Sequence, residues 1–334
     1  MGRLSSLDFE TGLRSPARAV FPNAPHAISK DEAAKDVRTQ HSERTQEGGS
    51  VDYRDLTVER RTLERGGSVG RIVIDRPNQL NALRMTVTDR ELICALDSFE
   101  AEDDMRAVIL TGAGDRAFCT GWDLSLIEDS SIPALEGLIR ANTELFLKIW
   151  HLRQPVIAAV NGHAVGTGAA IALAADLTVV SETARLAEPE IRHGALSPFL
   201  ILPFLTHAKA AHSFYYTGDA LDAQAMHRLG LANAVVPPEA LADEAMRVAA
   251  RLALVPPWAL QMKKRSLRAA YEAMGFGTAI RHHALADTLV IGGDFPEQRA
   301  LLDILEKQGM RAFLQARDGP FRDMAPPDSE SGRS

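Results

Sequence analysis

The sequence predicts an α/β fold followed by a helical C-terminal region, and three observations lead to this expectation. Between about residues 56 and 180, short apolar runs alternate with segments of helical spacing. This alternation, without hairpin turns between the later runs, is typical of parallel β–α–β units. After about residue 208, apolar side chains recur almost only at helical spacing. The length of 334 residues and the 46% hydrophobic content allow one large domain or two small ones.

The individual elements follow in chain order. Leu56–Arg60 and Gly70–Asp75 are expected to pair as strands around the turn Gly66-Gly67. An amphipathic helix is predicted over about 86–102, because apolar side chains recur there at helical spacing. The later α/β elements are strands at 107–111, 155–160 and 177–180, a helix around 138–149 and a helix of small residues at about 167–175. Further helices are expected over 221–229, 238–254, 257–274, 278–290 and 296–317.

The chain is predicted to have four parts. Residues 1–52 are expected to be a disordered extension, because the first 50 hold seven Lys/Arg, seven Asp/Glu and no tryptophan or tyrosine. An α/β core over 53–207, a helical region over 208–320 and a flexible tail over 321–334 would follow. For the extension, a myristoylation pattern at Met1–Ser6, a transit peptide and a later translation start all stay open.

Composition excludes several classes of protein. The formal net charge is -7, and the first 50 residues sum to zero, so the folded part is acidic. An acidic protein lacks the positive field that attracts nucleic acid. The two cysteines, Cys94 and Cys119, form no disulfide framework and suit a reducing cytoplasm, where we expect the protein. The longest apolar stretches, such as Pro155–Val160, are too short to span a bilayer, so no membrane partner is predicted.

No motif indicates a metal or a nucleotide. The sequence has no paired Cys-x-x-Cys, no His-Glu-x-x-His and no Walker lysine motif, so no metal site is predicted. Gly66–Gly70 matches the G-x-S-x-G elbow, but a strand follows it where the elbow requires a helix. Gly112–Ala117 resembles a dinucleotide fingerprint, but it opens no helix. Both segments are interpreted as turns.

Three segments follow successive parallel strands and carry chemistry. Asn161–Gly168 is a glycine-rich loop before the helix of small residues, and its backbone N–H groups can reach a ligand at the helix N-terminus. Phe118–Asp123 follows the preceding strand and is expected at the same sheet edge. Leu186–Ile191 follows the next strand and offers two carboxylates. Two backbone donors facing one carboxylate can stabilise an oxyanion and move a proton.

With these motifs in this order, the stretch from about Leu56 to Arg317 resembles the crotonase (enoyl-CoA hydratase/isomerase) superfamily. The matching residues are Asp75–Leu83, Leu110–Gly112, Ala117–Asp123, Gln154–Gly162, Ala175-Asp176, Glu188–Ile191, Thr217-Gly218 and Leu229–Asn233. The resemblance implies a spiral of β-β-α units, a helical C-terminal region used for trimerisation and an acyl-CoA substrate. It also implies a homotrimer or dimer of trimers, and no cofactor apart from the coenzyme A of the substrate.

The resemblance also assigns roles to residues of this sequence. The backbone amides of Trp122 and Thr167 correspond to the oxyanion hole, and Glu190 corresponds to the catalytic acid–base. The positions matching the substrate-binding segments are Asn81, Ala82, Leu83, Asp123, Leu124, Gly166, Gly168 and Lys264. Among these, the 81–83 segment and the 122–124 loop would lie near the adenosine of coenzyme A, and Lys264 would approach its phosphates.

Ala170 is the main departure from the family pattern. The hydratases place two glutamates beside the substrate, and the first of them corresponds to Ala170 here. A single remaining acid–base, Glu190, makes double-bond isomerisation of an enoyl-CoA the most economical reaction. Hydration, dehydration or thioester hydrolysis on the same site stays open, with Glu188 or His193 as possible stand-ins. A catalytically weak CoA-binding scaffold is the third hypothesis.

Thr167 is a second departure, because the family usually has glycine at this position. If the position requires a positive φ, a β-branched residue is expected to be strained there. The segment 193–203 also lacks the glycines usual after the catalytic glutamate and carries two prolines and bulky apolar residues. The acyl pocket is therefore expected to have a different shape.

Overall fold

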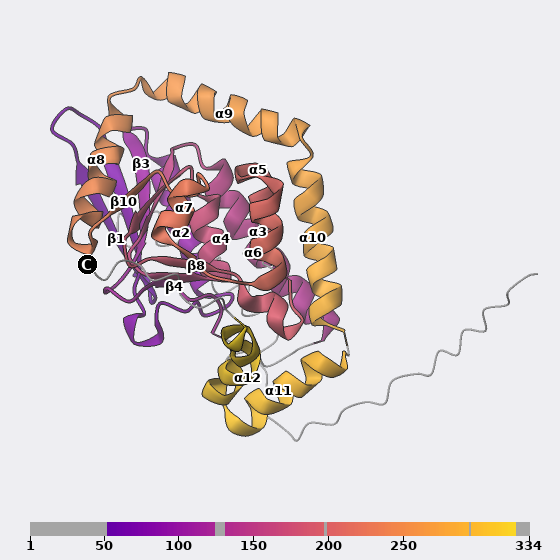
Figure 1. Cartoon of the computed structure of the whole chain (residues 1–334). Helices are drawn as coiled ribbons and strands as arrows, with labels where there is room; N and C mark the ends of the chain where they lie inside the picture. The colour runs from indigo at the N-terminus through magenta and orange to yellow at the C-terminus, as the bar shows by residue number, and fades with distance from the viewer. Residues whose placement is uncertain (1–51, 124–130, 197–198, 294, 325–334) are drawn as a thin grey trace, which may run out of the picture. The chain divides into compact units, whose positions relative to one another are not determined.

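The computed structural model describes residues 52–123, 131–196, 199–293 and 295–324 (Figure 1). A compact unit begins at Tyr53. Apart from Asp52, the extension predicted at 1–52 lies outside the described residues, so its disorder stays a prediction. Of the tail predicted at 321–334, the residues after Met324 also lie outside the described part. The last helix continues as far as Asp323.

A six-stranded sheet forms the centre of the fold. Its strands stand in the order β1 (Leu56–Thr62), β2 (Ser68–Ile74), β3 (Met105–Gly112), β5 (Val156–Val160), β7 (Leu177–Ser181) and β10 (Ala234–Val236). β1 and β2 form the predicted antiparallel hairpin, and every other pair of neighbours is parallel. The expected parallel β–α–β arrangement is confirmed. All residues of β5 are buried, as expected for a parallel strand covered on both faces.

A second, four-stranded sheet stands in the order β4 (Ala117–Cys119), β6 (His163–Val165), β8 (Arg185–Ala187) and β9 (Leu221–Asp222). β4, β6 and β8 follow β3, β5 and β7 along the chain, so each turn of the chain adds one strand to each sheet. A helix then follows in the first two turns, which confirms the spiral of β-β-α units. The sequence does not predict these strands, because two or three residues are too few to show an alternating pattern.

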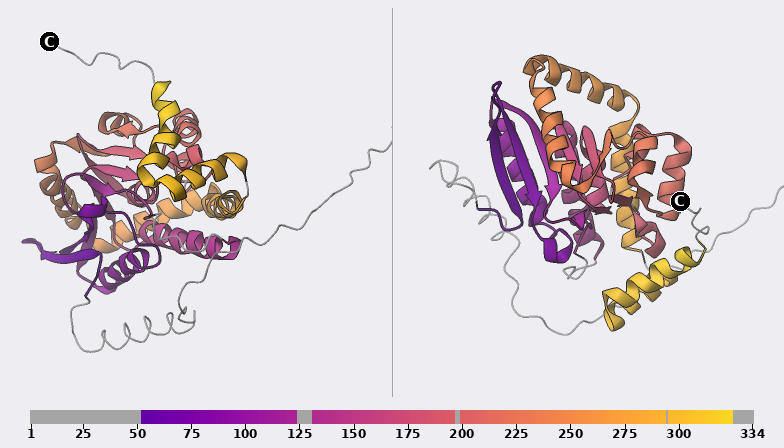
Figure 2. Two further views of the ribbon diagram at one scale, coloured as in Figure 1. Left: turned by 90° about the horizontal axis from the view of Figure 1, so that it is seen from below. Right: turned by 60° about the vertical axis from the view of Figure 1, so that its left-hand side comes forward.

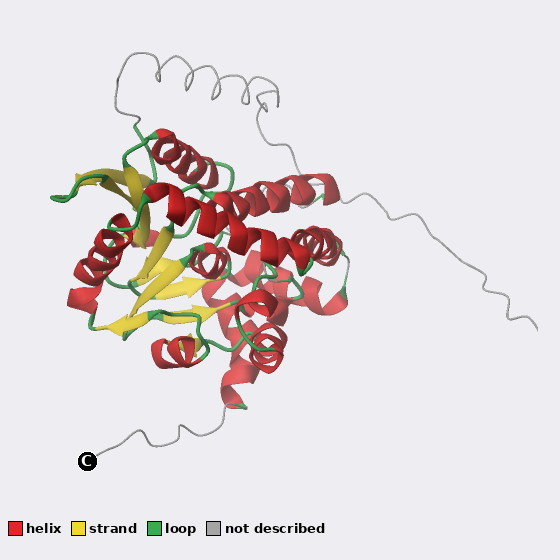
Figure 3. Ribbon diagram, turned by 90° about the horizontal axis from the view of Figure 1, so that it is seen from above, coloured by secondary structure: helices red, strands yellow, loops and turns green. Residues whose placement is uncertain are grey.

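Helices cover both faces of the large sheet (Figure 3). On one side, α2 (Thr88–Ala101), α3 (Ile132–His151) and α4 (Thr167–Ala174) share the main hydrophobic core. On the other side, α8 (Leu241–Ala253) packs on β3, β5 and β7 around a second core. Every residue of α4 is buried. Glycine at position 168 permits the close approach of α4 to β4, because a Cβ there would lie 2.0 Å from the carbonyl oxygen of Cys119.

The C-terminal part is mostly helical, as predicted, and also contains the short strands β9 and β10. Its helices are α5 (Leu202–Leu205), α6 (Ala208–Thr217), α7 (Ala223–Arg228), α8, α9 (Pro257–Ala273), α10 (Phe276–Ile291), α11 (Pro296–Gln308) and α12 (Met310–Asp323). The helix predicted over 296–317 divides at Gly309, whose φ is +82°. Figures 1 and 2 show α9 running from α8 to α10. No described helix is long and apolar enough to cross a membrane.

Asp89, in the first turn of α2, is a buried carboxyl group. Its side chain is 2% exposed, and Oδ1 has no hydrogen-bond partner among the described residues. Burial raises the pKa of Asp89 from 3.8 to about 7, although a backbone hydrogen bond from Thr86 favours the charged form. Because the folded-state pKa lies above the unfolded value, this group contributes stability at acid pH that is lost as the pH rises through 7.

Asparagine keeps the shape of the Asp89 side chain but cannot ionise. The Asp89→Asn variant is therefore expected to gain stability relative to the wild type as the pH rises. Relative to wild type, the variant's free energy of unfolding should be greater at pH 8 than at pH 5 by on the order of 2 kcal/mol. Urea unfolding of both proteins at the two pH values measures this difference. A variant-to-wild-type difference that is equal at both pH values would contradict the assignment.

Candidate active site

The glycine-rich loop, the 118–123 segment and Glu190 meet at the carboxyl ends of the parallel strands. A Cβ on Gly121 would lie 3.4 Å from the backbone nitrogen of Thr167, and one on Gly166 would lie 2.0 Å from Oε1 of Glu190. Side chains at positions 121 and 166 would therefore separate these segments. The structure thus brings together the residues that the sequence analysis expected at one edge of the sheet.

Gly166, not Thr167, takes the unusual backbone conformation. Gly166 has a φ of +55° and a ψ of -119°, a region that only glycine adopts readily. Thr167 is the first residue of α4, and its φ is not positive. The strain considered for a threonine at this position is therefore absent. As the first helical residue, Thr167 also has a backbone N–H without an intrahelical acceptor.

Trp122 pairs with Leu83 in an isolated parallel bridge. The N–H of Leu83 donates to the carbonyl of Gly121 at 2.8 Å, and the carbonyl of Leu83 accepts from the N–H of Asp123 at 3.0 Å. Leu83 is therefore hydrogen-bonded to both residues that flank Trp122. In this parallel pattern the N–H of Trp122 itself points away from Leu83. The indole Nε1 of Trp122 is buried and has no hydrogen-bond partner among the described residues.

Glu190 lies on the 3-10 helix η3 (Pro189–His193), directly after β8. Its Oε2 is buried without a hydrogen-bond partner among the described residues. Burial raises the pKa of Glu190 to about 7, while its own backbone N–H and the charge of Arg317 act in the opposite direction. A carboxyl group with a pKa near neutral can both take and return a proton, as general acid–base catalysis requires.

Asp287 on α10 is a second buried carboxyl group close to Glu190. It is 4% exposed, and Oδ1 accepts a hydrogen bond from the N–H of Leu196 at 3.0 Å. Burial raises its pKa to about 7, and the charge of Glu190 raises it further. His193, named as a possible stand-in, has a pKa lowered to about 4 by burial, so it is neutral at pH 7.

The helices behind the glycine loop add a polar pair that the sequence analysis did not single out. Asn142 on α3 is 2% exposed, and its Nδ2 donates to Oγ1 of Thr167 at 3.4 Å. Oδ1 of Asn142 is buried without a partner among the described residues. Ala170, three residues after Thr167, is fully buried and offers only a methyl group.

The segment predicted to lie near adenosine is built largely from internal hydrogen bonds. Asn81 is fully buried, and its Nδ2 donates to the carbonyls of Ala113 and Ala117 at 3.0 and 2.7 Å. Arg76 donates to the carbonyl of Ala82 and lies 3.3 Å from the carboxylate of Asp123. The side chains of Asn81 and Asp123 therefore hold the loop together. Leu124 lies outside the described residues.

That Lys264 approaches the coenzyme A phosphates stays a prediction, and within its own chain this side chain has other partners. Lys264 is 7% exposed, and its Nζ donates to Oδ2 of Asp176 at 2.7 Å and to the carbonyl of Gln154 at 2.9 Å. Gln154 and Asp176 precede β5 and β7, so this ammonium group lies at the opposite end of the strands from Glu190. In its own chain Lys264 thus pairs with a half-buried aspartate, which also pairs with Arg268 at 2.6 Å.

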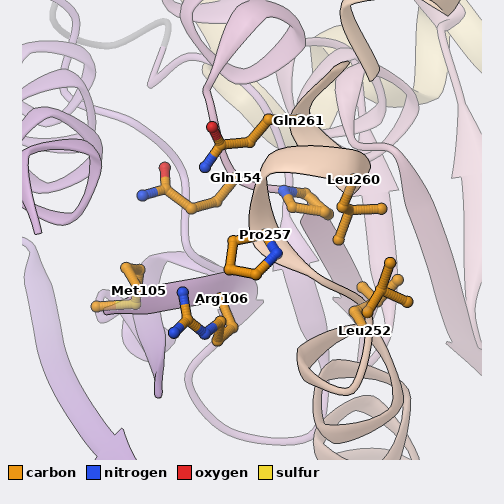
Figure 4. A pocket seen from close by; sticks show the side chains of 9 residues that line it. Met105, Arg106, Gln154, Leu252, Pro257, Leu260 and Gln261 are labelled. Carbon is orange, nitrogen blue, oxygen red and sulfur yellow. The ribbon is translucent and has the colours of Figure 1, made fainter. Parts of the chain in front are cut away.

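Two cavities border the residues described above. The first, at the Lys264 end of the strands, is about 10 Å³ and therefore holds no more than about one water (Figure 4). Its lining includes Met105, Arg106, Gln154, Leu252, Pro257, Leu260 and Gln261. The second is mostly apolar, measures about 430 Å³ and is lined by Ile191, Leu196, Leu200, Pro203, Ala208, Ala211, His212, Tyr215, Tyr216 and His283. Ile191 follows Glu190 in the chain, and Leu196, Leu200 and Pro203 belong to the segment 193–203 that is expected to alter the acyl pocket.

Comparison with known families agrees with this geometry. The profile of a family described as enoyl-CoA hydratase/isomerase matches residues 64–323. The chain belongs to the enoyl-CoA hydratase/isomerase family. Members of this family are lyases or isomerases, and they act on acyl-CoA thioesters. The assignment confirms the resemblance noted in the sequence.

Individual relatives agree with the family assignment. The chain is 33% identical over 284 residues to the mitochondrial enoyl-CoA hydratase of Pongo abelii, covering 83% of this chain and 90% of that protein. It is 30% identical over 269 residues to the crotonyl-CoA hydratase of Syntrophomonas wolfei, covering 80% and 99%. The crystal structure of an enoyl-CoA hydratase/isomerase from Xanthobacter autotrophicus Py2 superposes with a TM-score of 0.76 at 31% identity, covering 81% and 99%.

Proposed function

We propose that the protein catalyses the reversible addition of water to a 2-enoyl-CoA thioester, with Glu190 as the acid–base. The observation that carries this proposal is the buried Glu190 carboxyl group against Gly166. Its Oε2 has no hydrogen-bond partner in the described part of the chain, and its pKa is raised to about 7. The names of the Pongo and Syntrophomonas relatives, both hydratases, support hydration ahead of the other reactions of the family.

In the proposed mechanism, one carboxylate handles both proton transfers. Ionised Glu190 takes a proton from water while the water oxygen bonds to the β carbon, and the double-bond electrons move into the thioester to form an enolate. The backbone N–H groups of Trp122 and Thr167 donate to the enolate oxygen, and each such donor contributes about 2.7–4 kcal/mol in comparable sites. Glu190 then returns the proton to the α carbon, which restores the thioester and the ionised carboxylate.

Isomerisation is the second candidate, and Ala170 is the observation that favours it. With a methyl group at this position, α4 supplies no second carboxylate to activate water. Glu190 alone would suffice to remove a proton from C2 of a 3-enoyl-CoA and return it at C4. The same oxyanion hole would stabilise the dienolate between these two steps.

A substrate panel tests the proposal. The protein is incubated with 2-enoyl-, 3-enoyl- and 3-hydroxyacyl-CoA thioesters of several chain lengths, and the products and free coenzyme A are quantified. Interconversion of 2-enoyl- and 3-hydroxyacyl-CoA is expected. Turnover of 3-enoyl-CoA alone would replace hydration by isomerisation, and release of coenzyme A would indicate a hydrolase. Binding without any turnover would favour the scaffold hypothesis.

We further propose that the chain assembles as a homotrimer or a dimer of trimers, as the resemblance implies. α9 supports an assembly, because only Lys264 of this helix is buried in the single chain. Its apolar side chains Trp258, Met262 and Leu267 are 72%, 54% and 53% exposed. Exposed apolar side chains on one helix are typical of protein–protein interfaces.

A further inference from the structure

Asn142 is a polar residue in an apolar position. It lies on the buried face of α3, at helical spacing from the buried side chains of Leu145, Phe146 and Ile149. An asparagine loses its hydration on burial, and this loss is offset only when its polar atoms find partners. Nδ2 has Thr167, whereas Oδ1 is buried without a partner among the described residues. Packing alone therefore gives no reason for an amide here.

The amide group of Asn142 lies beside the site. Its partner Thr167 carries one of the proposed oxyanion-hole amides, so the contact places Asn142 next to that hole. Thr167 and Ala170 are three residues apart on α4, which puts them on neighbouring positions of the same helix face. α3 packs against α4. Asn142 thus brings a polar group to the region where Ala170 supplies none.

Hydration requires such a group. A water that attacks the β carbon must direct a lone pair at it, so its two O–H bonds need acceptors on either side. Ionised Glu190 can accept one of them and take its proton. The amide oxygen of Asn142 is the right kind of atom to accept the other, because it cannot itself remove a proton.

We propose that Asn142 holds the oxygen that is added to, or leaves, the β carbon, and that the Thr167 hydroxyl holds the Asn142 amide in place. The inference rests on the proposed hydratase function and names the element that replaces the missing carboxylate. The favoured substrates are accordingly 2-enoyl- and 3-hydroxyacyl-CoA thioesters. No group is transferred to or from Asn142, since the proton of water goes to Glu190 and from there to the α carbon.

The test separates water addition from enolate formation. Hydration is measured on the 2-enoyl-CoA that the wild type converts fastest. Enolate formation is measured as exchange of the α protons of the matching saturated acyl-CoA in D₂O, which needs Glu190 and the oxyanion hole but no attacking water. The variants are Asn142→Leu, which keeps the shape of the side chain, Thr167→Val, which removes the hydroxyl, and Thr167→Ser, which retains it.

Asn142→Leu is expected to lower hydration by about 10²-fold, the loss typical of a misplaced reactant, and to leave α-proton exchange within a few-fold of wild type. Thr167→Val should show the same split with a smaller loss, and Thr167→Ser, which keeps the hydroxyl, should hydrate faster than Thr167→Val. Thr167→Val also provides the test should Asn142→Leu fail to fold.

Three results would overturn the inference. Hydration that is unchanged in Asn142→Leu and Thr167→Val would remove the role in water addition. Equal loss of hydration and exchange would assign Asn142 to the architecture of the oxyanion hole. A wild type that exchanges α protons without hydrating any 2-enoyl-CoA would leave no water for Asn142 to hold. A wild type with neither activity would instead contradict the proposed function at Glu190.

Discussion

Replacing Glu190 by glutamine is expected to lower hydration and α-proton exchange together, by about 10²–10⁴-fold, the usual contribution of a general acid–base. Glutamine fills the same space against Gly166 but can neither take nor return a proton. The two activities fall together because both require the same carboxylate at the α carbon. Steady-state kinetics on the enoyl-CoA and deuterium incorporation into the saturated thioester measure the two losses.

The pH profile of the wild type provides the second readout for Glu190. The ionised form is the active one in both directions of hydration, so kcat/KM is expected to rise with pH through about 7, the pKa of Glu190, and then level off. The charge of Arg317 on α12 lowers the pKa of this carboxyl, and Glu190 in turn raises the pKa of Asp287 on α10. The glutamine variant should lose this rise.

Circular dichroism and thermal unfolding provide the control, because they show whether the Glu190→Gln protein is folded. A folded Glu190→Gln protein that retains hydration and exchange near wild-type levels would exclude Glu190 as the acid–base. Loss of hydration with full retention of exchange would move the α-proton transfer to another group. Asp287 would then be the next residue to replace, because its buried carboxyl has a similar pKa.

Replacing Gly166 by alanine is expected to abolish measurable turnover and to destabilise the protein. The new Cβ would lie 2.0 Å from Oε1 of Glu190, so the carboxyl group must move away from the substrate. The backbone conformation at φ +55° and ψ -119° also disfavours alanine, with a typical cost of about 1–3 kcal/mol for such a strained residue. Kinetics and chemical unfolding of the purified variant measure the two effects.

Gly137→Ala is the matched control for this substitution. Gly137 lies inside α3, and a Cβ built on it meets no atom within 4 Å. Alanine is favoured over glycine in a helix interior by about 1 kcal/mol, so this variant should be slightly more stable and fully active. A Gly166→Ala protein that matches Gly137→Ala in activity would show that Glu190 tolerates displacement, which is incompatible with the proposed role.

Most of the large sheet could be predicted from the sequence because its strands are continuous apolar runs. β5 and β7 are buried on both faces, and such strands differ clearly from the amphipathic helices between them. The second sheet could not be predicted, since β4, β6 and β8 have three residues each and are defined by their neighbours in space. β10 was missed for the same reason.

Some positions of the site residues could likewise be predicted from the sequence and others could not. Glu190 and Gly166 could be located from local motifs, because a glycine loop and a carboxylate after successive parallel strands must meet at one sheet edge. The partners of Lys264 could not be predicted, because the path of α9 decides which end of the strands a lysine reaches. Asn142 had a signal in the sequence, a polar residue within an apolar helical stripe, but this signal does not say what the residue faces.

The sequence by itself thus determined the family, the parallel α/β core and the loop–carboxylate pair, since all three depend on local patterns and on the order of motifs along the chain. Only the tertiary structure decided that Gly166 takes the positive φ in place of Thr167, that Lys264 neutralises Asp176 and that Asn142 contacts Thr167. These three facts depend on contacts between residues 25 to 88 positions apart or on a backbone angle set by such packing, which no local pattern encodes.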